Sequence, residues 1–148
     1  MSMSENLFHV CEELEGRTGR KNGYLHRGGK KHWKATSVRL AKAGVKLVLA
    51  GIRESSMKEV REEVANITGD FMVVQIDVSK WEDVERTAEK TLEEFGRIDI
   101  LVENAESFPA GKKGKSPPLM EIDEADWNHV LDVDLKGHLC CVRAVTLP

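Results

Sequence analysis

Three polar segments directly follow apolar runs of this sequence, and their side chains are the first candidates for binding a ligand. Arg53 comes after one run, Asp77-Val78 after the next, and Asn104-Ala105 after a third. In open parallel sheets, ligands bind beyond the carboxyl ends of the strands. If the three runs are parallel strands, these residues meet at one edge of the sheet and form a single binding site.

The cysteines and histidines give little sign of other chemistry. Cys11, Cys140 and Cys141 are an odd number without C-x-x-C spacing, which fits reduced thiols in a cytoplasmic protein better than disulfides or a zinc site. We expect Cys140 and Cys141 to pack a helix rather than act as nucleophiles, because the sequence places no histidine as their partner. His129 and His138 lack i, i+4 spacing, so no metal site is predicted.

The composition is that of an ordinary globular protein. Its 148 residues are 41% hydrophobic and 32% charged, with a net charge of -3. These values argue against disorder and against collagen-like or disulfide-rich classes. The longest apolar stretch is too short for a membrane span, and residues 1–15 lack the pattern of a signal peptide. We therefore expect a soluble protein with no membrane partner.

Hydrophobic periodicity then alternates between strand and helix. Strands are expected at 45–50, 71–76 and 98–102, and helices at 35–43, 54–67, 79–95 and from residue 123 or 124 onward. Ser79 is the expected cap of its helix, and Trp127, Leu131 and Leu135 are interpreted as core positions of the last helix. This alternation predicts an α/β fold of βαβ units around a parallel sheet.

Several segments, in order, resemble the short-chain dehydrogenase/reductase family. Residues 35–44 look like its first helix, and Asp77-Val78 resembles its adenine-contacting Asp-Val. Residues 95–106, FGRIDILVENAE, are close to the family's F-G-R-I-D-I-L-V-N-N-A-G, and residues 127–137 are close to its W-x-x-V-L-D-V-N-L-K-G. The resemblance implies a Rossmann-like three-layer α/β/α fold. It also implies an oxidoreductase that passes a hydride between NAD(H) or NADP(H) and a small alcohol or carbonyl substrate.

The resemblance assigns cofactor contacts to several positions of this chain. They are Gly28, Gly29, Arg53, Asp77, Val78, Asn104 and Ala105. In this fold an acid after the second strand binds the ribose hydroxyl of NAD(H), whereas a basic residue accommodates the 2′-phosphate of NADP(H). Arg53 therefore favours NADP(H), with an ordinary residue at a helix start as an equal alternative. For Asp77 and Asn104 the alternatives are a helix start and a plain turn.

The N-terminal part departs most from the family. The family's T-G-x-x-x-G-x-G turn, which must let a pyrophosphate approach the backbone, falls on His26, Arg27, Lys31 and Trp33. We therefore divide the chain into an irregular basic segment, 1–34, which replaces the first strand and the glycine turn, and a partial Rossmann domain, 35–148. The codons that could encode residues 17–34 favour the hypothesis that two compensating frameshifts altered this part of the gene or of its reported sequence. A nucleic-acid patch and a solvated arm are the alternatives.

Acidic residues stand where the family has neutral ones. Glu103 and Glu106 take the places of an Asn and a Gly, and Asp134 takes the place of the Asn that supports the family's proton relay. A carboxylate at position 103 is unfavourable beside cofactor phosphates. The family's catalytic Ser and Tyr-x-x-x-Lys are expected beyond Pro148, and the only tyrosine, Tyr24, lacks a lysine four residues later.

Three functions therefore remain open. The chain is a working NAD(P)(H)-dependent oxidoreductase, a non-catalytic half-domain that binds a nucleotide or dimerises, or an inactive product of a truncated or frameshifted gene. The resemblance favours the oxidoreductase family as the origin, with catalysis lost because the proton donor is missing and with cofactor binding weakened or lost. The last helix, over 124–145, is the expected surface for a homo-oligomer.

Overall fold

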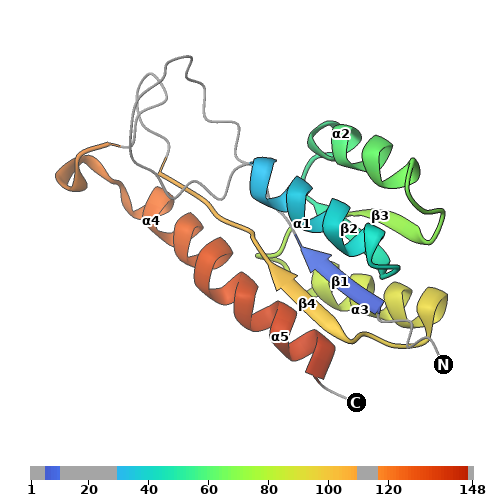
Figure 1. The fold of residues 1–148 in the computed structure, drawn as a ribbon. Coiled ribbons are helices and arrows are strands. Elements are labelled where there is room, and N and C mark those ends of the chain that lie inside the picture. The colour runs from blue at the N-terminus through green and yellow to red at the C-terminus, as the bar shows by residue number, and fades with distance from the viewer. Residues whose placement is uncertain (1–5, 11–29, 110–116, 147–148) are drawn as a thin grey trace.

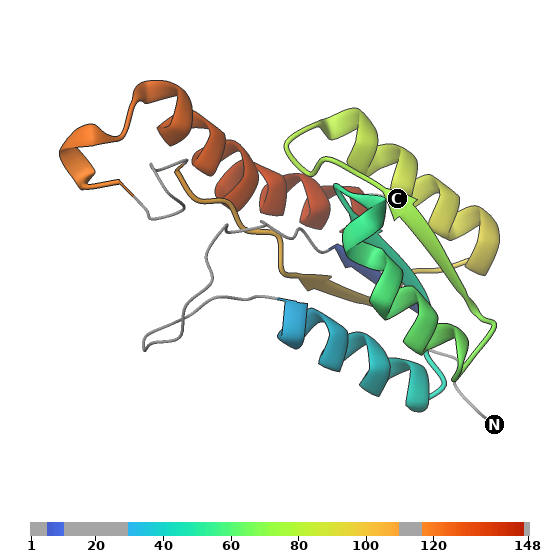
Figure 2. The same ribbon diagram turned by 90° about the horizontal axis from the view of Figure 1, so that it is seen from above.

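A four-stranded parallel sheet lies between two layers of helices in the computed structural model, which describes residues 6–10, 30–109 and 117–146 (Figure 1). The strands are β1 (Asn6–Val10), β2 (Lys46–Gly51), β3 (Phe71–Gln75) and β4 (Ile100–Glu103), in the order β3-β2-β1-β4. Helices α1 (Lys30–Lys42) and α2 (Glu54–Ala65) cover one face, and α3 (Trp81–Phe95) covers the other together with the C-terminal helices (Figure 2). The predicted three-layer α/β fold is confirmed.

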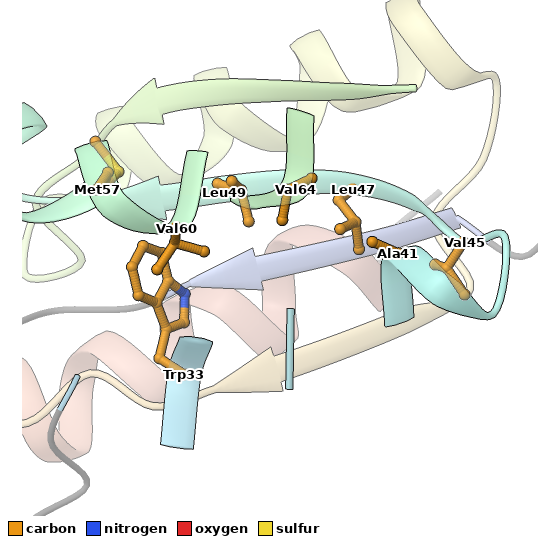
Figure 3. Packing of buried hydrophobic residues seen from close by; sticks show 8 residues of the cluster. All are labelled: Trp33, Ala41, Val45, Leu47, Leu49, Met57, Val60 and Val64. Atoms are coloured by element: carbon orange, nitrogen blue, oxygen red, sulfur yellow. The ribbon is translucent and has the colours of Figure 1, made fainter. Parts of the chain in front are cut away.

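Strand β2 is buried on both faces, as its nearly continuous apolar sequence predicts. Its residues Leu47, Val48, Leu49 and Ala50 are all 0% exposed. On one face, β2 packs against α1 and α2 in a core formed by Trp33, Ala41, Val45, Leu47, Leu49, Met57, Val60 and Val64 (Figure 3). On the other face, a second core includes Ala50, Ile76, Val78, Val84, Ala105, Val133, Cys140 and Cys141.

The first strand corrects a prediction. We expected an irregular segment over 1–34 with no first strand, but Asn6–Val10 forms β1 and pairs in parallel with both β2 and β4. Helix α1 begins at Lys30 rather than at residue 35. The prediction was wrong because it expected the strand immediately before that helix, whereas β1 ends at Val10, 20 residues before α1 begins at Lys30. The backbone of β1 instead satisfies the hydrogen-bonding groups of two neighbouring strands.

The polar contacts at the helix ends agree with the sequence prediction at one position and differ from it at another. Ser79 does not cap α3; the cap position is Lys80, and the Ser79 hydroxyl instead donates to the Asp77 carboxylate over 2.6 Å. Asp123 does cap α4 (Glu124–Leu131), because its carboxylate accepts from the backbone N–H of Asp126 over 2.7 Å. Gly96 ends α3 with a φ of 79°, the left-handed conformation that glycine adopts at little cost.

The C-terminal helix contains a π-helical turn. It runs without a break through α4 (Glu124–Leu131), the π-turn η3 (Asp132–Gly137) and α5 (His138–Thr146), after a short 3₁₀ turn η2 (Leu119–Glu121) (Figure 1). Its buried positions are Val133, Gly137, Cys140 and Cys141. No helix among the described residues has the length and apolar character needed to span a bilayer.

The other face of this helix is apolar and open to solvent, which corrects our assignment of Trp127, Leu131 and Leu135 to the core. They are 52%, 40% and 67% exposed, and Leu139 and Val142 continue the same face. A π-turn inserts one extra residue into the helix. In a regular α-helix, residues spaced four apart drift around the helix axis at each step. The extra residue of the π-turn offsets most of that drift, so these positions stay on one side of the helix. We call these five residues the apolar stripe.

Candidate functional site

The residues singled out by their position after strands lie at one end of the sheet. The register pairs Val10 with both Ala50 and Glu103, and Gly51 with Gln75, so the carboxyl ends of all four strands are adjacent. Arg53 follows β2 as the exposed cap residue of α2, in an extended conformation with φ -127° and ψ 124°. Gly28 and Gly29 lie outside the described residues.

Asp77 is held by a set of hydrogen bonds just after β3. One carboxylate oxygen accepts from the backbone N–H and the hydroxyl of Ser79, over 3.1 and 2.6 Å, and the other lies 3.3 Å from the Lys80 ammonium. Burial raises the pKa of Asp77, but these bonds outweigh it and leave the pKa below its ordinary value. Asp77 is therefore a fixed anion at neutral pH, in a turn that its own side chain stabilises.

Val78 and Ala105 form the apolar floor of this edge. Val78 is 3% exposed and Ala105 is 7% exposed, and both belong to the core shared with the C-terminal helix. Gly137 lets that helix approach, because a Cβ at this position would lie 2.8 Å from Cγ2 of Val78. Asn104 is half-buried between Glu103 and Ala105. The helix, the loop after β3 and the loop after β4 therefore touch directly beneath the strand ends.

The structure also brings together acidic groups that the sequence scatters. Asp134, in η3, accepts from the backbone N–H of Ser107 over 2.6 Å. Partial burial raises the pKa of Asp134, and the Ser107 bond and the nearby His138 oppose this rise. Burial also raises the pKa of Glu103, again opposed by His138. The sequence marked Glu103 and Asp134 as departures from the family, but it gave no signal that His138 lies near both.

Cys140 and Cys141 pack in the core, as predicted. Both are free and buried, at 8% and 1% exposure, and burial raises the pKa of Cys141 to about 12. A thiol with that pKa is not a nucleophile at neutral pH. Among the described residues, no group of three or more His, Cys, Asp or Glu side chains could hold a metal ion.

Comparison with known proteins identifies the chain. The family model for short chain dehydrogenase matches residues 34–147. The chain belongs to the short-chain dehydrogenase family. An uncharacterised oxidoreductase of Listeria monocytogenes is 31% identical over 112 residues, which are 76% of this chain and 43% of the relative. A 3-oxoacyl-[acyl-carrier-protein] reductase of Synechocystis is 33% identical over 115 residues, which are 76% of this chain and 44% of that protein.

Solved structures of this family give the same result for the fold. A short chain dehydrogenase from Bacillus anthracis superposes with a TM-score of 0.70 at 26% identity, over 95% of this chain and 49% of the other. The chain thus spans about half the length of the relatives that it matches.

The described residues suit the family's dinucleotide after β2 and oppose its negative charge near the end of β4. Arg53 presents an exposed guanidinium after β2, which suits a phosphate group. Glu103 and Asp134 place carboxyl groups beside the end of β4, and Glu103 has a buried oxygen without a hydrogen-bond partner among the described residues. Ionised carboxylates repel a pyrophosphate. These two residues therefore fit an anionic ligand only when they are neutral.

Proposed function

We propose that this short-chain dehydrogenase chain is the dinucleotide-binding part of an oxidoreductase that acts on an alcohol or carbonyl, and that it takes NADP(H). The observation that carries the proposal is the position of Arg53, Asp77 and Asn104-Ala105 after three adjacent parallel strands, in a chain of this family. Gly28 and Gly29 are proposed phosphate contacts from the sequence alone. A cytoplasmic location is also proposed, supported by the free thiols of Cys140 and Cys141.

In this proposal each strand-end residue has a separate role. The turn at Asp77 contacts the adenine, and Val78 is the apolar surface beneath it. Hydrogen bonds from Ser79 hold the Asp77 carboxylate in one orientation, which fixes the shape of this turn. Arg53 pairs with the 2′-phosphate at the end of β2, where a basic residue selects NADP(H). Asn104 and Ala105 support the ribose end after β4.

Thermal unfolding with added nucleotide tests the binding. A ligand at a hundredfold excess over its Kd stabilises the native state by about 2.7 kcal/mol. For a protein of this size that corresponds to a rise in Tm of about 5–10 °C. NADPH should give this shift and NADH a smaller one, and no shift with either nucleotide would overturn the proposal.

A matched pair of variants tests the role of Arg53. Arg53→Gln should weaken NADPH binding by about 10-fold or more, since hydrogen bonds to charged groups contribute about 1.5–3 kcal/mol, and should leave NADH binding nearly unchanged. Lys58→Gln is the control, because Lys58 is an exposed base on the same helix. Equal effects of the two substitutions on NADPH binding would show that Arg53 contributes only to the overall charge.

Hydride transfer by the 148 residues alone is not expected. The single tyrosine of the sequence, Tyr24, is followed four residues later by Gly28, and the reaction needs a positioned proton donor. Purified chain with NADPH and a panel of small carbonyl compounds should therefore show no NADPH oxidation above a blank without protein. Measurable turnover would contradict this part of the proposal.

A second copy of the chain is the proposed partner of the apolar stripe. The first half of the helix holds the acids Glu124, Asp126, Asp132 and Asp134 with one base, His129, and the second half holds the bases Lys136, His138 and Arg143 with no acid. An antiparallel pair related by a two-fold axis near Leu135 would bring each acidic half against a basic half and bury both stripes. Sedimentation should show a dimer, and Leu135→Glu should convert that dimer to a monomer. Glu85→Gln, a substitution of an exposed residue of α3, should leave the dimer intact. A monomeric wild type would refute the pairing.

A further inference from the structure

Ionisable groups gather where β4 meets the C-terminal helix. Glu103 is the last residue of β4, Asp134 lies in η3, and His138 is the first residue of α5. We call these three residues the His138 cluster. Oε1 of Glu103 and Nδ1 of His138 are buried without a hydrogen-bond partner among the described residues, and so is the hydroxyl of Ser107, a residue 2% exposed. Glu103, His138 and Ser107 therefore each hold a buried polar atom whose hydrogen-bonding capacity is not filled among the described residues.

The neighbouring elements do little to neutralise the two acids. Helix α3, which packs against α5, turns the uncharged residues Val84, Thr87, Ala88 and Thr91 inward. From α5 the facing ionisable groups are His138, Cys140 and Cys141, and from α4 His129 acts on Asp134. Asp132 and Lys136 of η3 pair with each other at the surface over 3.3 Å. In the part of the chain with described side chains, histidines are thus the basic groups that act on the cluster, and burial raises the pKa of both Glu103 and Asp134.

The His138 cluster lies next to the residues proposed to hold the nucleotide. Glu103 directly precedes Asn104-Ala105 in the chain, and Asp134 accepts a hydrogen bond from the backbone N–H of Ser107, three residues after Asn104. A dinucleotide brings two pyrophosphate charges to this edge. Added negative charge favours the protonated form of any carboxyl group nearby. Burial and the ligand therefore act on the two acids in the same direction.

We propose that nucleotide binding by this chain is coupled to the uptake of a proton by the carboxyl groups of Glu103 and Asp134. The proposal rests on the proposed function, because it requires that a dinucleotide binds. The proton comes from solvent and converts one carboxylate of the cluster to a neutral carboxylic acid. The neutral acid can donate a hydrogen bond, for which the unfilled hydroxyl oxygen of Ser107 is a candidate acceptor. Affinity then falls as the pH rises, so the site responds to pH.

Calorimetric titration of the full 148-residue chain with NADPH and with NADH tests the coupling. Titrations in two buffers of different ionisation enthalpy count the protons taken up on binding, and a series from pH 6 to pH 8 gives the affinity profile. Uptake of one proton weakens the wild-type affinity by as much as tenfold per pH unit. The 2′-phosphate of NADPH titrates near pH 6, so NADH, which lacks it, supplies the reference profile.

Four variants separate the source of the proton. Glu103→Gln and Asp134→Asn keep the size and the acceptor oxygen of each side chain, so one or both should flatten the profile and raise the affinity at pH 8. Glu124→Gln is the control, because it removes an exposed acid from the same helix. His138→Gln tests whether the imidazole is the titrating group.

The outcomes distinguish this inference from the proposed function. Proton uptake that is reduced in Glu103→Gln or Asp134→Asn and kept in Glu124→Gln supports the coupling. Binding with the same pH profile in wild type and both acid variants overturns it, as does a profile lost only in His138→Gln; both leave the proposed nucleotide binding intact. Absence of binding at every pH in wild type and in both neutral variants overturns the inference and the proposed function together.

Discussion

The close approach of Gly137 to Val78 gives the sharpest test of how the C-terminal helix packs against the residues that follow β3. A Cβ added at residue 137 would lie 2.8 Å from Cγ2 of Val78, 3.2 Å from its Cβ and 3.4 Å from the carbonyl oxygen of Asp132. Val78 is 3% exposed and β-branched, so it has little freedom to rotate away. The substitution Gly137→Ala therefore forces either the helix or the loop after β3 to move.

Two opposing terms determine the size of the effect. Alanine stabilises a helix relative to glycine by about 0.5–1 kcal/mol, whereas overpacking a core costs about 1–3 kcal/mol. The net loss of unfolding free energy for Gly137→Ala is therefore about 0–2.5 kcal/mol. In a Val78→Ala background the Cγ2 atom is gone, and the same substitution should be neutral or stabilising by as much as about 1 kcal/mol.

Urea denaturation of the wild type, the two single variants and the double variant completes the cycle. We expect a coupling free energy of about 1–2 kcal/mol, well above the roughly 0.3–0.5 kcal/mol scatter of independent sites. A coupling within that scatter, or a Gly137→Ala variant more stable than wild type, would refute the reasoning that this helix is seated on Val78. Gly69→Ala is a useful control, because a Cβ there would meet nothing within 4 Å.

Three further predictions follow from other contacts. Burial raises the pKa of Glu103, so the stability that its protonated form provides is fully present in acid and is lost as the pH rises through that pKa. Glu103→Gln should therefore unfold at a higher urea concentration than wild type at pH 7, and this difference should vanish near pH 4. Asp77 has a lowered pKa, so Asp77→Asn should cost about 1–3 kcal/mol at pH 7 and little at pH 2, as measured by the same denaturation. Trp33 of α1 is 5% exposed and packs in the core with residues of α2. Its substitution by alanine should cost about 3–5 kcal/mol, and a cost below about 1 kcal/mol in a thermal melt would contradict its place in the core.

Local sequence predicted most of the helices and strands because their signals are short-range. The continuous apolar run at β2 and the helical spacing of Val84, Ala88 and Leu92 correctly indicated a buried strand and an amphipathic helix. Boundaries moved by a few residues. The prediction that Ser79 caps α3 was wrong, because the Ser79 hydroxyl instead donates to the Asp77 carboxylate within the turn.

The first strand shows where local signals fail. Asn6–Val10 is five residues long and has no strong alternation, and what makes it a strand is hydrogen bonding to β2 and β4. Those partners lie 40 and 93 residues further along the chain. Pairing over such distances cannot be read from a short window. The exposed side of the last helix was missed for a related reason, because a π-turn shifts the face on which each residue lies.

The sequence by itself determined the family, the alternation of strands and helices, and the candidate residues after the strands, because each depends on residues close together in the chain. Only the tertiary structure decided which strand lies at the centre of the sheet and which face of the last helix meets it. It also decided that Glu103 and Asp134 share a neighbour in His138. The physical reason is that burial, electrostatic environment and strand pairing depend on groups brought together by folding.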